Sequence, residues 1–158
     1  MDTEPFETAQ ESGFPLVRQF SIFMENRVGT LLRLTKTFAA TELHILALSV
    51  VDAVDCSIIR MIVDDPDAAY LVLQEAGFPI CESELLVVSL PRGKRALLGV
   101  LMALMTGEVN LQYTYPLLAR PLGRPALAIS TDNLDSAVTV LRENNLTVLD
   151  HTDLTREF

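Results

Sequence analysis

Two consecutive βαββαβ units in an α+β fold are predicted by three features of the sequence. The apolar residues change between strand-like and helix-like spacing in the order strand, helix, strand, strand, helix, strand. The whole series then occurs a second time, with matching positions at nearly constant separation. Hydrophobic residues make up 49% of the 158 residues, which is enough to give both units a packed core.

The first unit is predicted over residues 16–83. Its first helix carries Leu31, Leu34 and Phe38 at helical spacing, which gives the helix one apolar face. Its second helix begins with acidic residues and a proline and stops at Gly77, as helix ends commonly do. The expected strands cover 16–24, 43–52, 56–63 and 78–83, and the expected helices cover 28–40 and 64–77.

The second unit is predicted over residues 84–154. Its first helix has leucine and methionine on most of its faces, and its second helix begins with the polar series TDN, which is typical of a helix cap. The expected strands cover 84–91, 109–118, 126–130 and 146–150, and the expected helices cover 94–105 and 131–145.

The two units align as an internal repeat. Asn26 and His44 are 18 positions apart, and so are Arg92 and Asn110, which gives an offset of 66 between the units. The offset becomes 68 later in the units, and the two additional residues fall in the turn 119–125, where insertions cost little. Two helices crossing between four strands define a ferredoxin-like unit.

The second strand of each unit would lie at the edge of its sheet, where a long apolar strand favours aggregation. Pairing these two edges gives one antiparallel sheet of eight strands with the helices on one face. The run ILALSVV is apolar on both sides, so the opposite face is predicted to stack on another copy in a homodimer. Arg60 would lie on such a strand, and it needs a partner unless that face is open to solvent or to a second copy.

The composition excludes several classes of protein. The net charge is −9, which disfavours nucleic acid and anionic membranes as partners. No apolar run reaches the roughly 18 residues of a membrane span, and the two cysteines cannot form a disulfide framework. We therefore expect a soluble cytoplasmic protein whose residues 1–15 form a flexible acidic tail.

The order and spacing of several segments resemble the ACT-domain family, specifically small proteins that consist of two ACT units. The resemblance covers about residues 17–154 and rests on FSIFMENRVGTL, LHILALSVVDAVDCSIIRMIVDDPDAAYLVL, ESELLVVSLP and EVNLQYTYPLL. It implies a protein that binds an amino acid or a related effector and passes the signal to a partner. It also implies an effector site between the first strand-to-helix loop of one unit and the second strand of its neighbour.

The segment ENRVGTL resembles such an effector loop. Gly29 would let the backbone approach a ligand, and the following helix start offers N–H groups to a carboxylate. Asn26 can donate and accept hydrogen bonds, although it could equally cap the helix while Gly29 serves only the turn. The predicted ligand site consists of Asn26, Val28, Gly29 and Thr30 together with Asn110, Leu111, Gln112 and Tyr113.

The corresponding loop of the second unit, LPRGKRAL, departs from this pattern because Arg95 stands in the place of Gly29. A weaker second site is predicted from Arg92, Lys94 and Arg95 together with His44, which takes the place of Asn110 in the first unit. The basic residues could bind an anion or an acidic partner, or could simply be a solvated helix start. His44 could contact a ligand or be only a polar strand start.

The expected function is that of a sensor that binds an amino acid and regulates an unidentified partner enzyme. No catalytic motif such as GxSxG, HExxH or a P-loop occurs, so we expect no enzymatic activity, no cofactor and no metal. The alternative is an adaptor or oligomerising scaffold that has lost effector binding, an alternative which the altered second loop supports.

Overall fold

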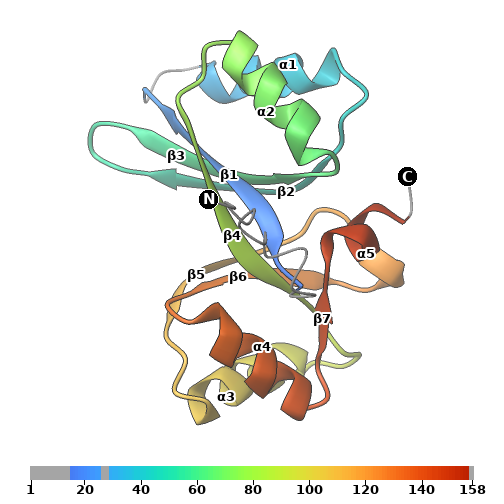
Figure 1. Cartoon of the computed structure of the whole chain (residues 1–158). Coiled ribbons are helices and arrows are strands. Elements are labelled where there is room, and N and C mark those ends of the chain that lie inside the picture. The colour runs from blue at the N-terminus through green and yellow to red at the C-terminus, as the bar shows by residue number, and fades with distance from the viewer. Residues whose placement is uncertain (1–14, 26–28, 157–158) are drawn as a thin grey trace, which may run out of the picture.

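The computed structural model describes residues 15–25 and 29–156 (Figure 1). The predicted acidic tail and the loop residues Asn26 and Val28 lie outside the described residues, apart from Pro15. The strands are β1 (Val17–Met24), β2 (Ile45–Asp52), β3 (Ser57–Val63), β4 (Ile80–Ser89), β5 (Leu111–Pro116), β6 (Ala126–Thr131) and β7 (Thr147–Leu149). The helices are α1 (Thr30–Ala39), α2 (Pro66–Glu75), α3 (Ala96–Thr106), the short 3-10 helix η1 (Pro121–Gly123), α4 (Leu134–Glu143) and α5 (His151–Thr155).

The strand β4 belongs to both units. Its first half pairs with β1, and its second half pairs with β6 and β7. The strand order is β2-β3-β1-β4-β6-β5, and β7 pairs with the edge of β4 opposite to β6. All of these pairings are antiparallel. The sheet therefore has seven strands, and the prediction of eight strands joined through the two second strands is corrected. The predicted boundary between residues 83 and 84 falls inside β4.

The two second strands, β2 and β5, lie at opposite ends of the strand order but meet once. A single bridge joins Ala47 to Leu117, and the carbonyl of Leu46 accepts hydrogen bonds from the N–H groups of Leu118 (2.8 Å) and Ala119 (3.1 Å). Both strands have an irregularity at equivalent positions, between Ile45 and Ala47 and between Leu111 and Tyr113. Such bulges increase the local twist, and the sheet curls until its two ends touch.

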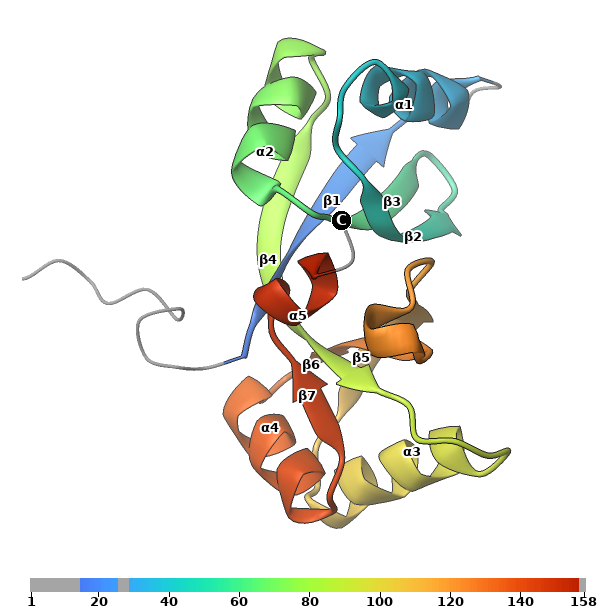
Figure 2. The ribbon, with the colours of Figure 1, turned by 90° about the vertical axis from the view of Figure 1, so that its right-hand side faces the viewer.

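The helices α1 and α2 cover the outer face of one half of the sheet, and α3 and α4 cover the outer face of the other half (Figures 1 and 2). Three hydrophobic clusters follow from this arrangement: one lies under each helical pair, and the third lies between the two half-sheets. The inner faces thus cover each other within one chain. Most of this apolar face, which was predicted to stack on another copy, is therefore buried within one chain, and its exposed part is a rim that includes Phe23 and Val51.

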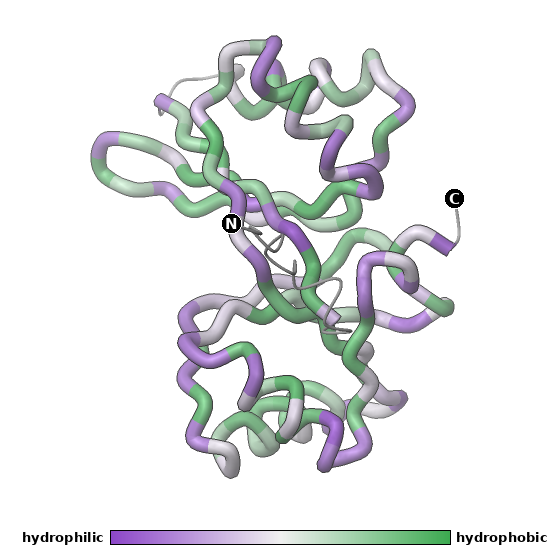
Figure 3. Tube along the Cα trace, viewed as in Figure 1, coloured by the Kyte–Doolittle hydropathy of each residue, from purple (hydrophilic) through white to green (hydrophobic). Residues whose placement is uncertain are grey.

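The hydropathy of β4 follows its two roles (Figure 3). The residues Glu82–Glu84 are exposed, whereas Leu85, Leu86, Val87 and Val88 are fully buried, because helices and strands of the second unit enclose them. Leu85 and Val87 point into the cluster between the half-sheets, while Leu86 and Val88 point under α3 and α4. The alternation of side chains along a strand explains this division.

The space between the half-sheets also contains a polar group. Gln19 is fully buried, donates to the hydroxyls of Ser83 (2.9 Å) and Tyr113 (2.5 Å), and accepts a hydrogen bond from the Tyr115 hydroxyl (2.5 Å). Burial, reinforced by Tyr113, raises the pKa of Tyr115 above its ordinary range, although Arg60 acts in the opposite direction. Tyr115 therefore stays protonated and can act as a donor across the interface between the two units.

The C-terminal end of α3 depends on close packing against α4. A Cβ atom at Gly107 would lie 2.9 Å from Val140 Cγ2, whereas a Cβ at Gly99, also on α3, would meet nothing within 4 Å. Gly107→Ala should therefore destabilise the fold by about 1–3 kcal/mol through overpacking. Gly99→Ala should stabilise it by up to about 1 kcal/mol through helix propensity.

Urea denaturation of the two variants and the parent protein measures both effects. Equal stability of the two variants would show that α4 moves away from Gly107 at no cost, which would contradict tight packing at this point.

Candidate functional site at the start of β5

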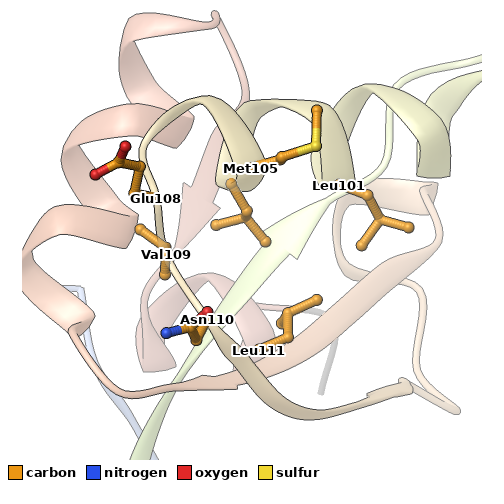
Figure 4. A pocket seen from close by; sticks show the side chains of 7 residues that line it. Leu101, Met105, Glu108, Val109, Asn110 and Leu111 are labelled. Carbon is orange, nitrogen blue, oxygen red and sulfur yellow. The ribbon is translucent and has the colours of Figure 1, made fainter.

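An open hollow of ≈ 520 Å³ lies between the end of α3 and the start of β5 (Figure 4). Two residues of the predicted ligand site, Asn110 and Leu111, line it. The other lining residues are Leu101, Leu104, Met105, Glu108 and Val109. The wall is therefore mainly apolar and carries one carboxylate and one amide.

Local structure places the two polar side chains of this hollow. The helix α3 ends at Gly107, and Glu108 has a positive φ of 56°, which turns the chain into β5. Asn110 is held by Asp132, which accepts from the backbone N–H (3.3 Å) and from the side-chain Nδ2 (3.1 Å) of Asn110. These bonds leave the amide oxygen and the second side-chain N–H of Asn110 for a ligand.

The chemistry of this hollow suits part of an amino acid. The carboxylate of Glu108 and the amide oxygen of Asn110 are both acceptors that suit an ammonium group, and the Glu108 carboxylate points away from Asn110 (Figure 4). The apolar wall matches a hydrophobic side chain. Among the residues that line the hollow there is no lysine, arginine or histidine, so a carboxylate has no cationic partner there.

Two further residues of the predicted site point elsewhere. Gln112 lies in the bulge of β5, and its Oε1 accepts a hydrogen bond from the Ser130 hydroxyl (3.0 Å). Tyr113 faces the space between the half-sheets, where its hydroxyl meets Gln19 and its ring lies 3.8 Å from the guanidinium carbon of Arg60. The structure thus separates Asn110 and Leu111 from Gln112 and Tyr113.

The described residues of the first loop lie far from β5. Gly29 has φ = 91° and precedes Thr30, the first residue of α1. Gly29 lines a different hollow of ≈ 440 Å³, which otherwise consists of α1 residues. In both views, α1 belongs to one helical layer and the start of β5 adjoins the other (Figures 1 and 2). Gly29 and Thr30 therefore do not meet Asn110 within one chain.

The loop of the second unit forms its own basic hollow. Arg92 and Gly93 line a volume of ≈ 310 Å³ together with Arg120 and Arg124, while Lys94 and Arg95 are exposed at the start of α3. Sequence reasoning missed Arg120 and Arg124. Their signal was the two-residue insertion in the turn of the repeat, which brings two arginines next to the basic loop.

His44 is placed with an acidic residue and does not line the basic hollow. Asp64 accepts the backbone N–H of His44 at Oδ1 (2.9 Å), and its Oδ2 lies 3.0 Å from His44 Nδ1. The carbonyl of Asp64 lies 2.6 Å from Nε2 of His151 on α5. His44 therefore helps to fix the start of β2, whereas the predicted weaker site would have paired it with Arg92, Lys94 and Arg95.

Among the described residues, no helix has the length and apolar character that a membrane span requires. The same residues contain no group of three or more histidine, cysteine, aspartate or glutamate side chains that could hold a metal ion.

Comparisons with known proteins identify the architecture. A family model described as an ACT domain pair matches residues 16–157. The crystal structure of protein BT0572 from Bacteroides thetaiotaomicron has 30% sequence identity and a TM-score of 0.81, and the match covers 90% of this chain and 97% of that one. No curated protein matches.

Two other solved structures share the fold at low identity. The ligand-free regulatory subunit of aspartate kinase from Thermus thermophilus has 11% identity and a TM-score of 0.55, and the match covers 80% of this chain and 91% of that one. The regulatory subunit of aspartate kinase from Thermus flavus has 9% identity and a TM-score of 0.54, with coverage of 84% and 94%.

The carboxylate of Asp64 makes the stability of the β2 start dependent on pH. Burial acts to raise its pKa, but the hydrogen bonds from His44 and Asp65 outweigh burial and lower the pKa below its ordinary value of 3.8. The ionised group therefore stabilises the fold above that pH, and this contribution disappears as the pH falls through the lowered pKa.

Asp64→Asn should destabilise the protein by about 1 kcal/mol at pH 7, and by progressively less below pH 3.8. Urea titrations of the parent and the variant at several pH values measure the difference. A difference that stays constant down to the acid end would show that the charge of Asp64 contributes nothing.

Proposed function

Because this chain belongs to the ACT domain pair family, we propose that it is a non-catalytic regulatory protein which binds an amino acid and acts on a partner enzyme. The effector binds in the hollow at the start of β5, and a second copy of the chain completes the site. The observation that carries this proposal is that the hollow offers acceptors and an apolar wall but no cation. The ammonium group of an amino acid is thereby matched, whereas its carboxylate is not.

Cations that could pair with the ligand carboxylate are present at the N-terminal end of α3. Arg92, Lys94 and Arg95 precede α3, whereas the hollow is lined by the second half of α3 and by the residues that follow it. A helix of 11 residues is about 16 Å long, so these cations do not reach the hollow of their own chain. They would reach it from a neighbouring α3 that runs in the opposite direction.

The surface of α3 supports such a neighbour. The helix contains no charged residue, and its exposed side chains form an apolar stripe at helical spacing. These side chains are Leu97, Leu98, Leu101, Met102 and Met105. Met105, at 70% exposure, adjoins the exposed Leu111 across the hollow. Exposed apolar surface that is continuous over a helix and a strand marks an interaction site.

A twofold homodimer through α3 satisfies these observations together. Identical stripes pack on each other, and a twofold axis across the helices makes them antiparallel. Lys94 and Arg95 of one copy then approach Glu108 of the other, so the rim charges are complementary. The strand β5 ends the strand order, and its outer edge carries only the bridge at Leu117 among the described residues. Two copies can also join there.

The first-unit loop is the alternative source of hydrogen-bond donors for the ligand carboxylate. If Asn26, Val28, Gly29 and Thr30 supply the donors for the carboxylate, they too must come from another copy, because Gly29 and Thr30 are remote from β5 in one chain. The antiparallel α3 pair favours the second-unit loop, since that loop adjoins the apolar stripe directly.

Signalling follows from a ligand that bridges two copies. A ligand with tenfold higher affinity for the closed pair supplies about 1.4 kcal/mol of coupling to that arrangement. The partner enzyme senses which arrangement is populated. The regulatory subunits of aspartate kinase, which share this fold as separate chains, support a regulatory role of this kind.

The alternative is a scaffold that dimerises through α3 without an effector. The same exposed stripe favours it, because hydrophobic packing of α3 needs no ligand. The two functions differ in whether the basic loop affects anything besides assembly.

A thermal-shift screen against the twenty amino acids tests the sensor. Binding to the folded state at 100 times Kd adds about 2.7 kcal/mol of stability, and the double variant Lys94→Glu/Arg95→Glu should lose this shift. Arg142→Glu, a reversal on the exposed side of α4, should keep it and serves as the control. No shift for any amino acid at millimolar concentration would refute the sensor and leave the scaffold.

The choice of loop is decided by a second pair of variants. Any side chain at Gly29 strains the backbone because φ is positive there. Gly29→Ala introduces this backbone strain without a large side chain, and it is therefore the control for Gly29→Trp. We expect both to keep the ligand shift. A shift lost only in Gly29→Trp would assign the donor loop to the first unit.

Met105→Glu tests the dimer. A carboxylate buried at the C-terminal end of the apolar stripe should weaken self-association at least tenfold, as measured by sedimentation equilibrium, because it has no partner there. Leu71→Glu, which replaces an exposed leucine on α2, should leave association unchanged. Unchanged association in Met105→Glu would exclude α3 as the interface.

A further inference from the structure

Arg60 lies on the inner face of the first half-sheet, where no described acidic side chain pairs with it. It lies on β3 and is half-buried, and its Nε is buried without a hydrogen-bond partner. Within residues 15–25 and 29–156, it makes no salt bridge. By contrast, Arg18 on β1 binds Asp67 (2.7 Å) and Glu82 (2.9 Å) on the outer face.

The ring contact that Arg60 makes does not supply a hydrogen-bond acceptor to its buried Nε–H. Its guanidinium carbon lies 3.8 Å from the centre of the Tyr113 ring. Such a stacking contact is worth about 0.5–2 kcal/mol and orients the guanidinium plane, but it satisfies no N–H group. A partly desolvated cation with unpaired donors is unfavourable by itself, and in native structures it commonly has an ion or ligand as partner. The forked donors of arginine fit a carboxylate.

Neighbouring strands add two hydroxyl groups beside Arg60. Ser49 of β2 and Ser21 of β1 are its direct partners in the sheet, so their side chains lie on the same face. Both are half-buried. Serine hydroxyls can donate to an anion, and the three side chains therefore form a row of donors across β2, β3 and β1.

The next row outward is apolar. Two residues farther along each strand, Ile58 pairs with Val51 and with Phe23, and alternation puts all three on the face of Arg60. Phe23 and Val51 are each 43% exposed. The row of donors is thus continuous with an open hydrophobic surface.

We propose that this face is a binding site for a small organic acid with an apolar group. The carboxylate pairs with Arg60 and the hydroxyls of Ser21 and Ser49, and the apolar group lies on Phe23, Ile58 and Val51. This site goes beyond the proposed effector site, because it uses neither the hollow at β5 nor a second copy. Tyr113 holds Arg60 in place from the opposite half-sheet.

The internal repeat assigns the site to the first unit alone. Ser49 and Arg60 are cross-strand partners, and the equivalent partners in the second unit are Tyr115 and Ala128. The second unit therefore has no cation at this position, and Tyr115 and Ala128 belong to the apolar cluster between the half-sheets. If the fold itself required a cation at the position of Arg60, a cation would be expected at the equivalent position of both units.

Titration with phenylacetate tests the proposal. This probe has a carboxylate and an apolar ring, and phenylacetamide is its neutral counterpart. In protein labelled with ¹⁵N-arginine, phenylacetate should shift the Nε–H signal of Arg60, and phenylacetamide should not. By calorimetry, Arg60→Gln should bind phenylacetate at least tenfold more weakly than the parent.

Matched variants isolate the two parts of the site. Arg33 also stacks on a ring, with its guanidinium carbon 4.3 Å from the centre of Phe78, so Arg33→Gln removes a stacked arginine elsewhere and should keep the affinity. Phe23→Ser should weaken phenylacetate binding and leave acetate binding unchanged. The Lys94→Glu/Arg95→Glu variant should bind phenylacetate normally, which separates this site from the effector site.

An unmoved Nε–H signal of Arg60 in the parent protein would overturn the proposal, even if Arg60→Gln failed to fold. Equal affinity of folded Arg60→Gln and the parent would overturn it as well, because phenylacetate would then bind elsewhere. Retained binding in Arg60→Lys alongside its loss in Arg60→Gln would support the need for a cation.

Discussion

The continuity of β4 is the constraint on which the rest of the structure depends. One strand serves as the last strand of the first unit and the first strand of the second. Because side chains alternate along an uninterrupted strand, the inner face of one unit continues as the inner face of the other. The helices of both units consequently lie outside, and the inner faces must enclose a core between them. A turn within β4 would release both units from this arrangement.

The same constraint explains why the surfaces of interest remain open. The curl that follows from β4 brings β2 and β5 together at only one bridge, near Leu117. The start of β5 and the neighbouring face of α3 lie away from this point and receive no cover from the first unit. Hydrophobic burial thus closes the interior while it leaves an uncharged helix and a strand edge exposed. The effector site that we propose lies at this uncovered edge.

Much of the fold could be predicted from the sequence, because the helices α1 to α4 and most strands have local signals, whereas η1 and α5 were not predicted. The proline and acids before α2 and the polar series before α4 gave the correct elements, and the structure shows Asp65 and Asn133 as side-chain caps. The fusion of two strands into β4 could not be predicted from the template of eight strands. In ICESELLVVS there is no glycine or proline to mark a turn, and that absence was the available signal for one continuous strand.

The candidate site could be predicted only in part, since its residues depend on contacts between distant segments. Asn110 and Leu111 follow the repeat and were identified, whereas the bulge in β5 directs Gln112 and Tyr113 to other surroundings. Pairing Arg60 with Tyr113 requires the curl of the sheet and has no local signal.

The contrast between the two inner faces shows how a repeat can separate stability from binding. Leu85 and Ala128 of the second unit stand where the first unit has Gln19 and Arg60, by the offsets of 66 and 68 that align the two units. Leu85 and Ala128 are fully buried in the shared cluster. The first unit also contributes Val17, Leu46, Ala47 and Ile62 to this cluster, whereas its Phe23 and Val51 reach solvent at the rim. The first unit carries Arg60, which makes no salt bridge with any described residue, and the fold tolerates the cost of this half-buried cation because the surrounding apolar contacts exceed it.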